Sequence, residues 1–204
     1  MELILLPLIY TNPIAIGIFI VACLIWMIPE TIATPRQMAK AARKKVAIQD
    51  RGSMLILLGL QWIGLFLNFI LGWLIPSAAI SWHRTAPFGL GIIFILFGVA
   101  LRWYAIWTLG QYFRRDVAVS TDQHVVQSGP YRCIRHPAYS GTLLTMLGIG
   151  LAVTNWAGLV SLLICTLLGH LYRVNIEEKA LVQAIGQPYV QYIQHTRRFI
   201  PWIF

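Results

Sequence analysis

A long uncharged stretch of the chain runs from Tyr139 to Tyr172 and reads YSGTLLTMLGIGLAVTNWAGLVSLLICTLLGHLY. A helix needs about 20 apolar residues to cross the hydrocarbon of a bilayer. This stretch is much longer, and Thr154, Asn155 and Trp156 interrupt it near its middle. It therefore predicts a hairpin of two membrane helices, with its turn near the far interface.

Three further apolar stretches precede the hairpin. They are Leu3–Ile28, Met54–Ile75 and Pro87–Trp107. The first has no basic segment before it and no small-residue cleavage site after it, so we interpret it as a retained anchor rather than a signal peptide. Its first turns are expected to be interrupted by Thr11, Asn12 and Pro13. With the hairpin, the sequence predicts an all-α, polytopic integral membrane protein with about five transmembrane helices.

Composition agrees with a membrane protein. The 204 residues are 58% hydrophobic and 11% charged, whereas soluble domains carry roughly 25% charged residues. A soluble domain of this length must still expose much of its surface to water. Lipid is therefore the expected solvent for most of the chain.

The net charge of +9 is distributed unevenly. Five crossings place three basic segments on one side: Arg36, Lys40, Arg43, Lys44, Lys45 and Arg51; Arg102, Arg114, Arg115, Arg132 and Arg135; and Arg173, Lys179, Arg197 and Arg198. Only Arg84 is left on the other side. This asymmetry predicts a cytoplasmic basic face in a cell inner membrane or the endoplasmic reticulum. Anionic lipid headgroups are its expected partner, and no nucleic acid is expected.

Several common sites are not predicted. The three cysteines, Cys23, Cys133 and Cys165, are scattered and form neither a disulfide framework nor a metal site. No GxGxxG follows a strand, and no P-loop, HExxH or GxSxG is present.

The first candidate cluster is Gly129–Gly141, which reads GPYRCIRHPAYSG. Pro137 suits the first position of a helix, where its missing N–H is no loss, and free N–H groups at a helix start attract anions. Arg132, Arg135 and His136 precede that start, and Tyr131 and Tyr139 add aromatic faces. The stretch predicts a site for a carboxylate or phosphate. Alternatively, the arginines anchor the membrane interface and the tyrosines form an interfacial belt.

The second cluster is His170, Arg173 and Glu177, whose spacing places them on one helical face. Ionisable residues at membrane depth indicate function, because they are costly to keep there. Alternatively, Arg173 and Glu177 pair to close the helix end and His170 is a satisfied interior histidine. Glu178 is expected to be a solvated neighbour.

The chain beyond this cluster is expected to leave the membrane. From Arg173 the pattern predicts an amphipathic cytoplasmic helix, which Gly186 and Pro188 end. A second short helix carries Tyr189 and Tyr192.

The hairpin brings the two clusters to the same side of the membrane. One supplies N–H donors, arginines and a histidine, and the other supplies a cation and a carboxylate. These groups suit a zwitterionic cofactor with a carboxylate, an amine and ribose hydroxyls.

At these residues the sequence resembles the isoprenylcysteine carboxyl methyltransferase family, within a wider group of small membrane methyltransferases that includes phospholipid N-methyltransferases. The run GPYRxxRHPxYxG is complete at Gly129–Gly141. The second element is matched by Arg173, Glu177, Glu178, Gly186, Tyr189, Tyr192, Arg198 and Pro201. The resemblance covers about the last hundred residues, from Gly110 onward.

The resemblance implies transfer of a methyl group from S-adenosylmethionine at the membrane surface. By position, the cofactor residues are Gln123, His124, Val125, Val126, Tyr131, His136, Pro137, Ala138, Tyr139 and Glu177. Arg173 is the residue that faces the substrate carboxylate, and Arg173, Glu177 and His136 are the catalytic candidates. In this interpretation residues 1–204 form one membrane domain, with membrane helices in 1–107 and the catalytic region in 108–204.

Four functions stay open from the sequence. The leading one is O-methylation of a lipophilic, prenylcysteine-like carboxylate that enters from the bilayer. Methylation of a lipid amine would need a general base, for which Glu177 or His136 could serve. A sterol-reductase-like enzyme and a non-catalytic membrane scaffold are the others.

Overall fold

A computed structural model describes residues 6–41, 47–48, 50, 52–80, 83–113, 118–119 and 124–200. Its helices are α1 (Leu8–Thr11), α2 (Pro13–Ala41), α3 (Ser53–Leu74), α4 (Thr85–Leu109), α5 (Pro137–Ala152), α6 (Trp156–Ile185) and α7 (Gln187–His195). Three short 3-10 turns are η2 (Pro76–Ala78), η3 (Gly110–Tyr112) and η4 (Gly129–Arg132). The strands β1 (Ala47–Ile48) and β2 (Ala118–Val119) form one short antiparallel pair.

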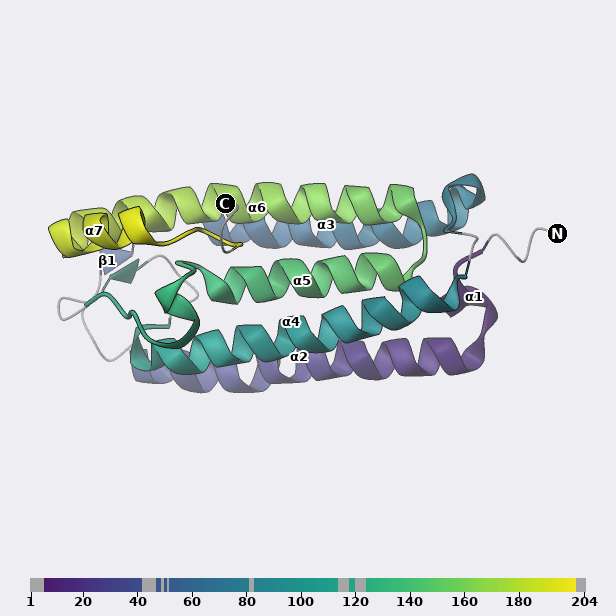
Figure 1. Cartoon of the computed structure of the whole chain (residues 1–204), viewed down its shortest axis with the longest axis horizontal. Coiled ribbons are helices and arrows are strands. Elements are labelled where there is room, and N and C mark those ends of the chain that lie inside the picture. The colour runs from purple at the N-terminus through teal and green to yellow at the C-terminus, as the bar shows by residue number, and fades with distance from the viewer. Residues whose placement is uncertain are drawn as a thin grey trace.

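The long helices form an elongated bundle (Figure 1). The closest pairs are α4 with α5 and α3 with α6. Both α7 and β1 lie at one end of the bundle, and α1 lies at the other (Figure 1). Apart from the short strand pair, the described chain is helical, so the predicted all-α class is confirmed.

The predicted hairpin is present as α5 and α6. Helix α5 begins at Pro137 and ends at Ala152, and α6 begins at Trp156. Asn155 caps α6, because its Oδ1 accepts a hydrogen bond from the Gly158 N–H at 3.0 Å. Its Nδ2 donates to the Ile75 carbonyl at 2.9 Å. One asparagine thus starts α6 and ties the hairpin turn to the end of α3.

Glycines allow α4 and α5 to approach closely. A Cβ on Gly98 would lie 2.6 Å from the Gly141 carbonyl oxygen, and one on Gly148 would lie 2.5 Å from that of Gly91. Small residues at such contacts are typical of membrane helix pairs. This packing brings the start of α5, and the cluster before it, against the end of α4.

Three segment boundaries differ from the sequence prediction. The amphipathic segment after Arg173 is not a separate helix but the last part of the continuous α6. Helix α2 continues to Ala41, so the backbone of Arg36 and Lys40 lies in a helix rather than in a loop. Arg102 lies inside α4 and not in the segment that follows it. The break at Asn12, between α1 and α2, is as predicted.

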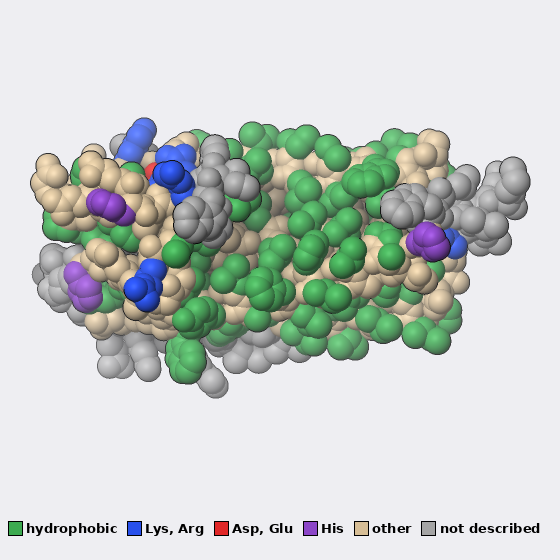
Figure 2. Space-filling model, viewed as in Figure 1, with side chains coloured by type: hydrophobic (Ala, Val, Ile, Leu, Met, Phe, Trp, Pro, Cys, Tyr) green, Lys and Arg blue, Asp and Glu red, His purple; other side chains and the backbone are tan. Residues whose placement is uncertain are grey.

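The surface of the bundle suits lipid. Large hydrophobic side chains cover its middle, and the Lys and Arg side chains in this view gather mostly at the α7 end (Figure 2). Three described segments are long and apolar enough to cross a membrane: Ser53–Leu74, Thr85–Tyr112 and Trp156–Ile185. Helix α2 contributes a shorter apolar segment, Pro13–Met27. Helix α5 is about 24 Å long at 1.5 Å per residue, less than a typical hydrocarbon core of about 30 Å.

Candidate active site

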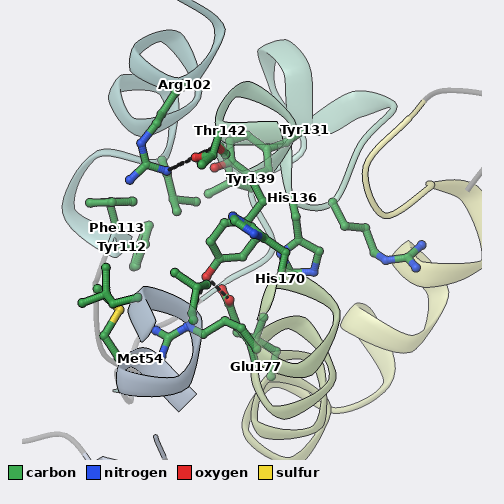
Figure 3. Close-up of a pocket in the computed structure, with 18 of the residues that line it drawn as sticks. Met54, Arg102, Tyr112, Phe113, Tyr131, His136, Tyr139, Thr142, His170 and Glu177 are labelled. Carbon is green, nitrogen blue, oxygen red and sulfur yellow. Dashed lines mark hydrogen bonds between the residues drawn. The ribbon is translucent and has the colours of Figure 1, made fainter. Parts of the chain in front are cut away.

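A cavity of about 310 Å³ lies near the α7 end of the bundle (Figure 3). Its polar wall includes Arg102, Arg135, His136, Tyr139, His170, Arg173 and Glu177. Its apolar wall includes Trp26, Met27, Leu57, Leu58, Trp62 and Leu65 from α2 and α3. Trp62 and Met27 are also exposed on the lipid-facing surface. The wall of the cavity therefore extends from a charged end to side chains that are exposed on the outside of the bundle.

The cavity gathers most of the cofactor candidates. Eight of them line it: His124, Val125, Val126, Tyr131, His136, Ala138, Tyr139 and Glu177. Pro137 begins α5 and is buried, but it is not part of the wall. Gln123 lies outside the described residues, as does Pro201 of the second motif.

Arg173 is almost completely buried, with 2% of its surface exposed. Its Nε donates to the Tyr139 hydroxyl at 3.3 Å, and its Nη1 donates to Ser53 Oγ at 2.8 Å. It also forms an ion pair with Asp50. The ion-pair partner of the guanidinium therefore comes from the segment before α3, and the Glu177 charge, on which the intrahelical alternative relied, adds to it.

Asp50 was missed by sequence reasoning. Its Oδ1 accepts from Ser53 Oγ at 2.8 Å, and its Oδ2 accepts from the Met54 N–H at 3.3 Å. Burial alone would raise the Asp50 pKa, but the hydrogen bond from Ser53 and the charge of Arg173 hold it below its ordinary value. Asp50 therefore presents a fixed negative charge to Arg173.

Tyr139 connects the second cluster to the first. Its hydroxyl donates to Glu177 Oε2 at 2.9 Å and accepts from Arg173 Nε. Its ring stacks on His136, with centroids 5.7 Å apart, and meets the His170 ring edge-on at 5.1 Å. Figure 3 shows the hydroxyl pointing at the Glu177 carboxylate. One tyrosine at the start of α5 thus sets the spacing of Arg173 and Glu177 on α6.

Glu178 is not the solvated neighbour that the sequence predicted. Only 7% of its surface is exposed. Its carboxylate pairs with Arg135 Nε at 2.9 Å, His136 Nε2 at 3.2 Å and Arg198 Nη2 at 2.8 Å. The expectation was wrong because α6 continues past Arg173 and packs against the segment before α5 and the chain after α7.

This arrangement also changes the predicted anion site. Arg135, which the sequence assigned to a bound carboxylate or phosphate, donates to Glu178 and to the carbonyls of Ile193 and Thr196. Arg132 is exposed and does not line the cavity. Arg135 also lines the cavity, but its guanidinium is hydrogen-bonded to the chain itself; the other arginines in the wall are Arg102 and Arg173.

Arg102 was assigned to the basic face by sequence reasoning, yet it lines the cavity. Its Nη1 donates to the Ala138 carbonyl and to Thr142 Oγ1, both at 3.2 Å (Figure 3). The available signal was its position inside an otherwise apolar helix, where a charge is costly. Its contacts tie the end of α4 to the first turn of α5.

Aromatic side chains complete the wall beside Arg102. They are Tyr112, Phe113 and Tyr131. Burial raises the pKa of the Tyr131 hydroxyl, and the Glu177 charge adds to this shift. Tyr192 of α7 donates to the Tyr131 carbonyl at 2.7 Å, which anchors the turn before α5. The cavity therefore has uncharged aromatic faces in its wall, and Tyr131 among them lies close enough to feel the Glu177 charge.

Comparisons with known proteins agree with these motifs. Residues 91–183 match the model of the isoprenylcysteine carboxyl methyltransferase family. The chain is 30% identical over 115 residues to protein-S-isoprenylcysteine O-methyltransferase B of Arabidopsis thaliana, covering 55% of this chain and 58% of that protein. It is 31% identical over 116 residues to the Xenopus laevis enzyme, covering 56% of this chain and 40% of that protein. The family resemblance inferred from the two motifs is confirmed.

One solved structure shares the fold. It is a eukaryotic intramembrane Ras methyltransferase, an isoprenylcysteine carboxyl methyltransferase, with a TM-score of 0.67 and 24% sequence identity. The alignment covers 96% of this chain and 70% of that one. The likeness shows that the two chains share a fold. The match to the Arabidopsis protein spans little more than half of that relative's length.

Proposed function

We propose that this chain uses S-adenosylmethionine to O-methylate the carboxylate of a lipophilic, prenylcysteine-like substrate at the membrane interface. The observation that carries the proposal is the cavity, in which the buried Arg173 stands at the charged end of an apolar channel wall. An acid with a long hydrocarbon tail has the same two parts. The family match at residues 91–183 supports the reaction class.

The apolar wall fits the tail of such a substrate. Leu57, Leu58, Trp62 and Leu65 of α3 and Trp26 of α2 belong to it. Leu58 and Trp62 also face the surroundings of the bundle. A tail could therefore enter from the bilayer without passing through water, as the hydrophobic effect favours.

The polar wall fits the cofactor. The positively charged groups of S-adenosylmethionine can be held by the Glu177 carboxylate. The adenine of the cofactor can stack against the aromatic faces of Tyr112, Phe113 or Tyr131. Backbone and side chains of His124, Val125, Val126, His136, Ala138 and Tyr139 would complete this part of the site. The cavity lies within the roughly 300–1,000 Å³ range of small-molecule sites. Gln123 and Pro137 are the remaining cofactor candidates in this proposal.

In this proposal the chain aligns reactants rather than moving protons. When bound, S-adenosylmethionine supplies a methyl group already activated by its sulfonium. Arg173 cannot deprotonate, so it holds the attacking carboxylate as an anion in a fixed orientation. Positioning of this kind can lower a barrier by up to about 7–11 kcal/mol. Tyr139 keeps Arg173 and Glu177 at a constant spacing.

A carboxylate suits this site better than an amine. An amine needs a group that takes its proton. Of the two candidates, His136 directs Nε2 at the buried Glu178, and Glu177 accepts from the Tyr139 hydroxyl. An arginine next to the reacting atom attracts an anion and opposes a protonated amine.

We further propose five membrane crossings, formed by α2 to α6, with the α7 end in the cytoplasm. Both chain regions, 1–107 and 108–204, then belong to one membrane domain. The basic residues at the α7 end would contact anionic lipid headgroups.

The proposal is tested with purified protein in lipid nanodiscs, S-adenosylmethionine labelled in its methyl group, and either a farnesylated cysteine acid or mixed phospholipids. We expect the label to appear in the thioether acid. Base should release this label, because base hydrolyses esters. Base-stable label in phospholipid would replace the proposal with N-methylation. Arg173→Lys is the informative variant, because it keeps the charge but loses the planar fork. It should raise KM or lower kcat for the acid while leaving cofactor affinity within about twofold.

A further inference from the structure

Asp50 and the proposed substrate carboxylate need the same partner. Arg173 forms an ion pair with Asp50 through Nη1, and the same nitrogen donates to Ser53 Oγ at 2.8 Å. The Arg173 Nε donates to the Tyr139 hydroxyl at 3.3 Å. A guanidinium grips a carboxylate with two neighbouring nitrogens, and every such pair includes Nη1 or Nε. A substrate carboxylate held in this way must therefore take over a contact that the chain already makes.

Asp50 is the contact that can be exchanged, because it offers Arg173 the same chemical group as the substrate. Its side chain is 17% exposed, whereas that of Arg173 is 2% exposed. The carboxylate can therefore turn toward solvent, and the guanidinium cannot. The Asp50 Oδ2 accepts from the Met54 N–H at 3.3 Å, and the Asp50 carbonyl accepts from the Ser53 N–H at 2.8 Å. Asp50 thus stays anchored at the start of α3 when its Oδ1 releases Arg173.

The charge beside Arg173 changes during the proposed reaction. When the substrate carboxylate takes the methyl group, the electron pair of the broken C–S bond stays on sulfur, and the acid becomes a neutral ester. The guanidinium then loses the charge of its ligand, and an uncompensated buried charge is costly. The Glu177 charge also acts on Arg173, but the proposal assigns that carboxylate to the cofactor. An interaction that is stronger with the reactant than in the transition state slows the reaction, unless a second anion replaces it.

We infer that Asp50 is an exchangeable counterion of Arg173, which gives way to the substrate carboxylate and pairs with the guanidinium again as methylation removes the substrate's charge. The inference rests on the proposed O-methylation. It makes Asp50 a positioning residue that acts through Arg173, and it means that Asp50 weakens the binding of the acid while it favours turnover. The alternative is a purely structural role as a cap on the first turn of α3, for which the contact of Oδ2 with Met54 is sufficient.

The test uses Asp50→Asn, which keeps the shape of the side chain and removes its charge. Dissociation constants of a farnesylated cysteine acid and of its methyl ester are measured by calorimetry in nanodiscs without cofactor. We expect the acid to bind about 10- to 100-fold more tightly than it binds wild type, as for a hydrogen bond to a charged group, and the ester to change by less than about threefold. With S-adenosylmethionine present, KM and kcat for the acid should both fall, kcat by about 10-fold. A residue that only caps α3 does not tighten acid binding when its charge is removed.

Two control variants separate the charge of Asp50 from its other contacts. Asp50→Glu keeps a carboxylate, and Ser53→Ala removes a neutral contact of Arg173 while both charges stay. In both, the ratio of the acid and ester dissociation constants should stay within about threefold of wild type, because exposed or neutral contacts contribute less than a buried charge. Melting temperatures give a reading even where Asp50→Asn is less stable than wild type. The acid should raise the melting temperature of Asp50→Asn more than the ester does, because the tighter ligand stabilises the folded state more.

Several results would overturn the inference. Equal affinity of wild type and Asp50→Asn for the acid would mean that the Asp50 charge does not compete with the substrate. Acid binding that tightens in Asp50→Glu as much as in Asp50→Asn would lead to the same conclusion. A fall in kcat together with a rise in KM would reduce Asp50 to a structural cap. If wild type binds the acid but does not methylate it, the proposed function fails, whereas the calorimetric comparison of the variants still decides whether the counterion is exchanged.

Discussion

At the scale of single residues, Glu178 contacts two arginines and a histidine, and its removal should be strongly destabilising. Glu178→Ala leaves Arg135 and His136 buried beside no carboxylate. Removing one partner of a buried ion pair lowers the free energy of unfolding by about 3–5 kcal/mol. We expect a clear fall in the melting temperature in detergent. The matched control is Lys179→Ala at the next, exposed position, which should change little. A Glu178→Ala protein as stable as this control would mean that the carboxylate is solvated after all.

Tyr139 lets activity be separated from stability. Tyr139→Phe keeps the ring that stacks on His136 and removes only the hydroxyl between Arg173 and Glu177. Hydrogen bonds to charged groups contribute about 1.5–3 kcal/mol, so kcat/KM for the acid should fall roughly 10- to 100-fold. The melting temperature should fall only modestly, because the ring stays packed against His136 and His170. Steady-state kinetics check this, and unchanged kinetics would exclude the hydroxyl from a role in alignment.

Asp50 gives a prediction about pH. Its folded-state pKa lies below its ordinary value of 3.8, so the ionised carboxylate stabilises the fold at every pH above that value. This contribution is lost as the pH falls through the lowered pKa. The gap in melting temperature between wild type and Asp50→Asn should stay constant at neutral pH and shrink below about pH 4. Ser53→Ala keeps the charge but removes one hydrogen bond that lowers the Asp50 pKa, so it should show a weaker pH dependence of the same sign. A constant gap down to strong acid would contradict the assignment.

The sequence identified some of these residues and not others, for a physical reason. Arg173, Glu177 and His136 lie in local motifs, so spacing and resemblance pointed to them. Asp50 is far from Arg173 along the chain, and only the packing of α3 on α6 brings the two together. Glu178 looked solvated because the chain that covers it comes from other segments.

At the scale of helices, the contact between α4 and α5 depends on the absence of side chains. A Cβ on Gly148 would lie 2.5 Å from the Gly91 carbonyl oxygen and 2.6 Å from the Ile95 nitrogen. Backbone atoms cannot move aside as a flexible side chain can, so Gly148→Ala should force the helices apart and cost more than about 1–3 kcal/mol.

Gly89 provides the matched control for this substitution. It lies in α4 with open space around its Cβ direction. Gly89→Ala should be neutral or stabilising, by up to about 1 kcal/mol. Melting temperatures of the two variants in the same detergent are the measurement. Equal values would show that the helices tolerate a wider separation than the structure has.

Apolar length predicted which helices exist, but not where they end at the charged side. The turn at Thr154 and Asn155 interrupts an uncharged run, and α5 and α6 meet there as expected. No residue in the sequence marks whether α6 ends or continues at Arg173. A membrane helix and the amphipathic segment after it have the same helical periodicity, so a continuous helix and two separate helices look alike. Arg102 was grouped with the charges of the following segment, although it lies inside the predicted stretch Pro87–Trp107 and inside α4.

At the scale of the whole molecule, the two ends of the bundle should face opposite sides of the membrane. Cys133 is exposed near the start of α5, at the α7 end, and Thr85 is exposed at the start of α4, at the other end. In a background with Cys23→Ala and Cys165→Ala, the natural Cys133 should react with a membrane-impermeant maleimide only in inside-out vesicles. With Cys133 also replaced by Ser, Thr85→Cys should react only in right-side-out vesicles. Labelling of both from one side would mean that α4 does not cross. Exchange of the two patterns would keep the crossing and reverse the orientation, placing the arginine-rich end outside against the charge rule.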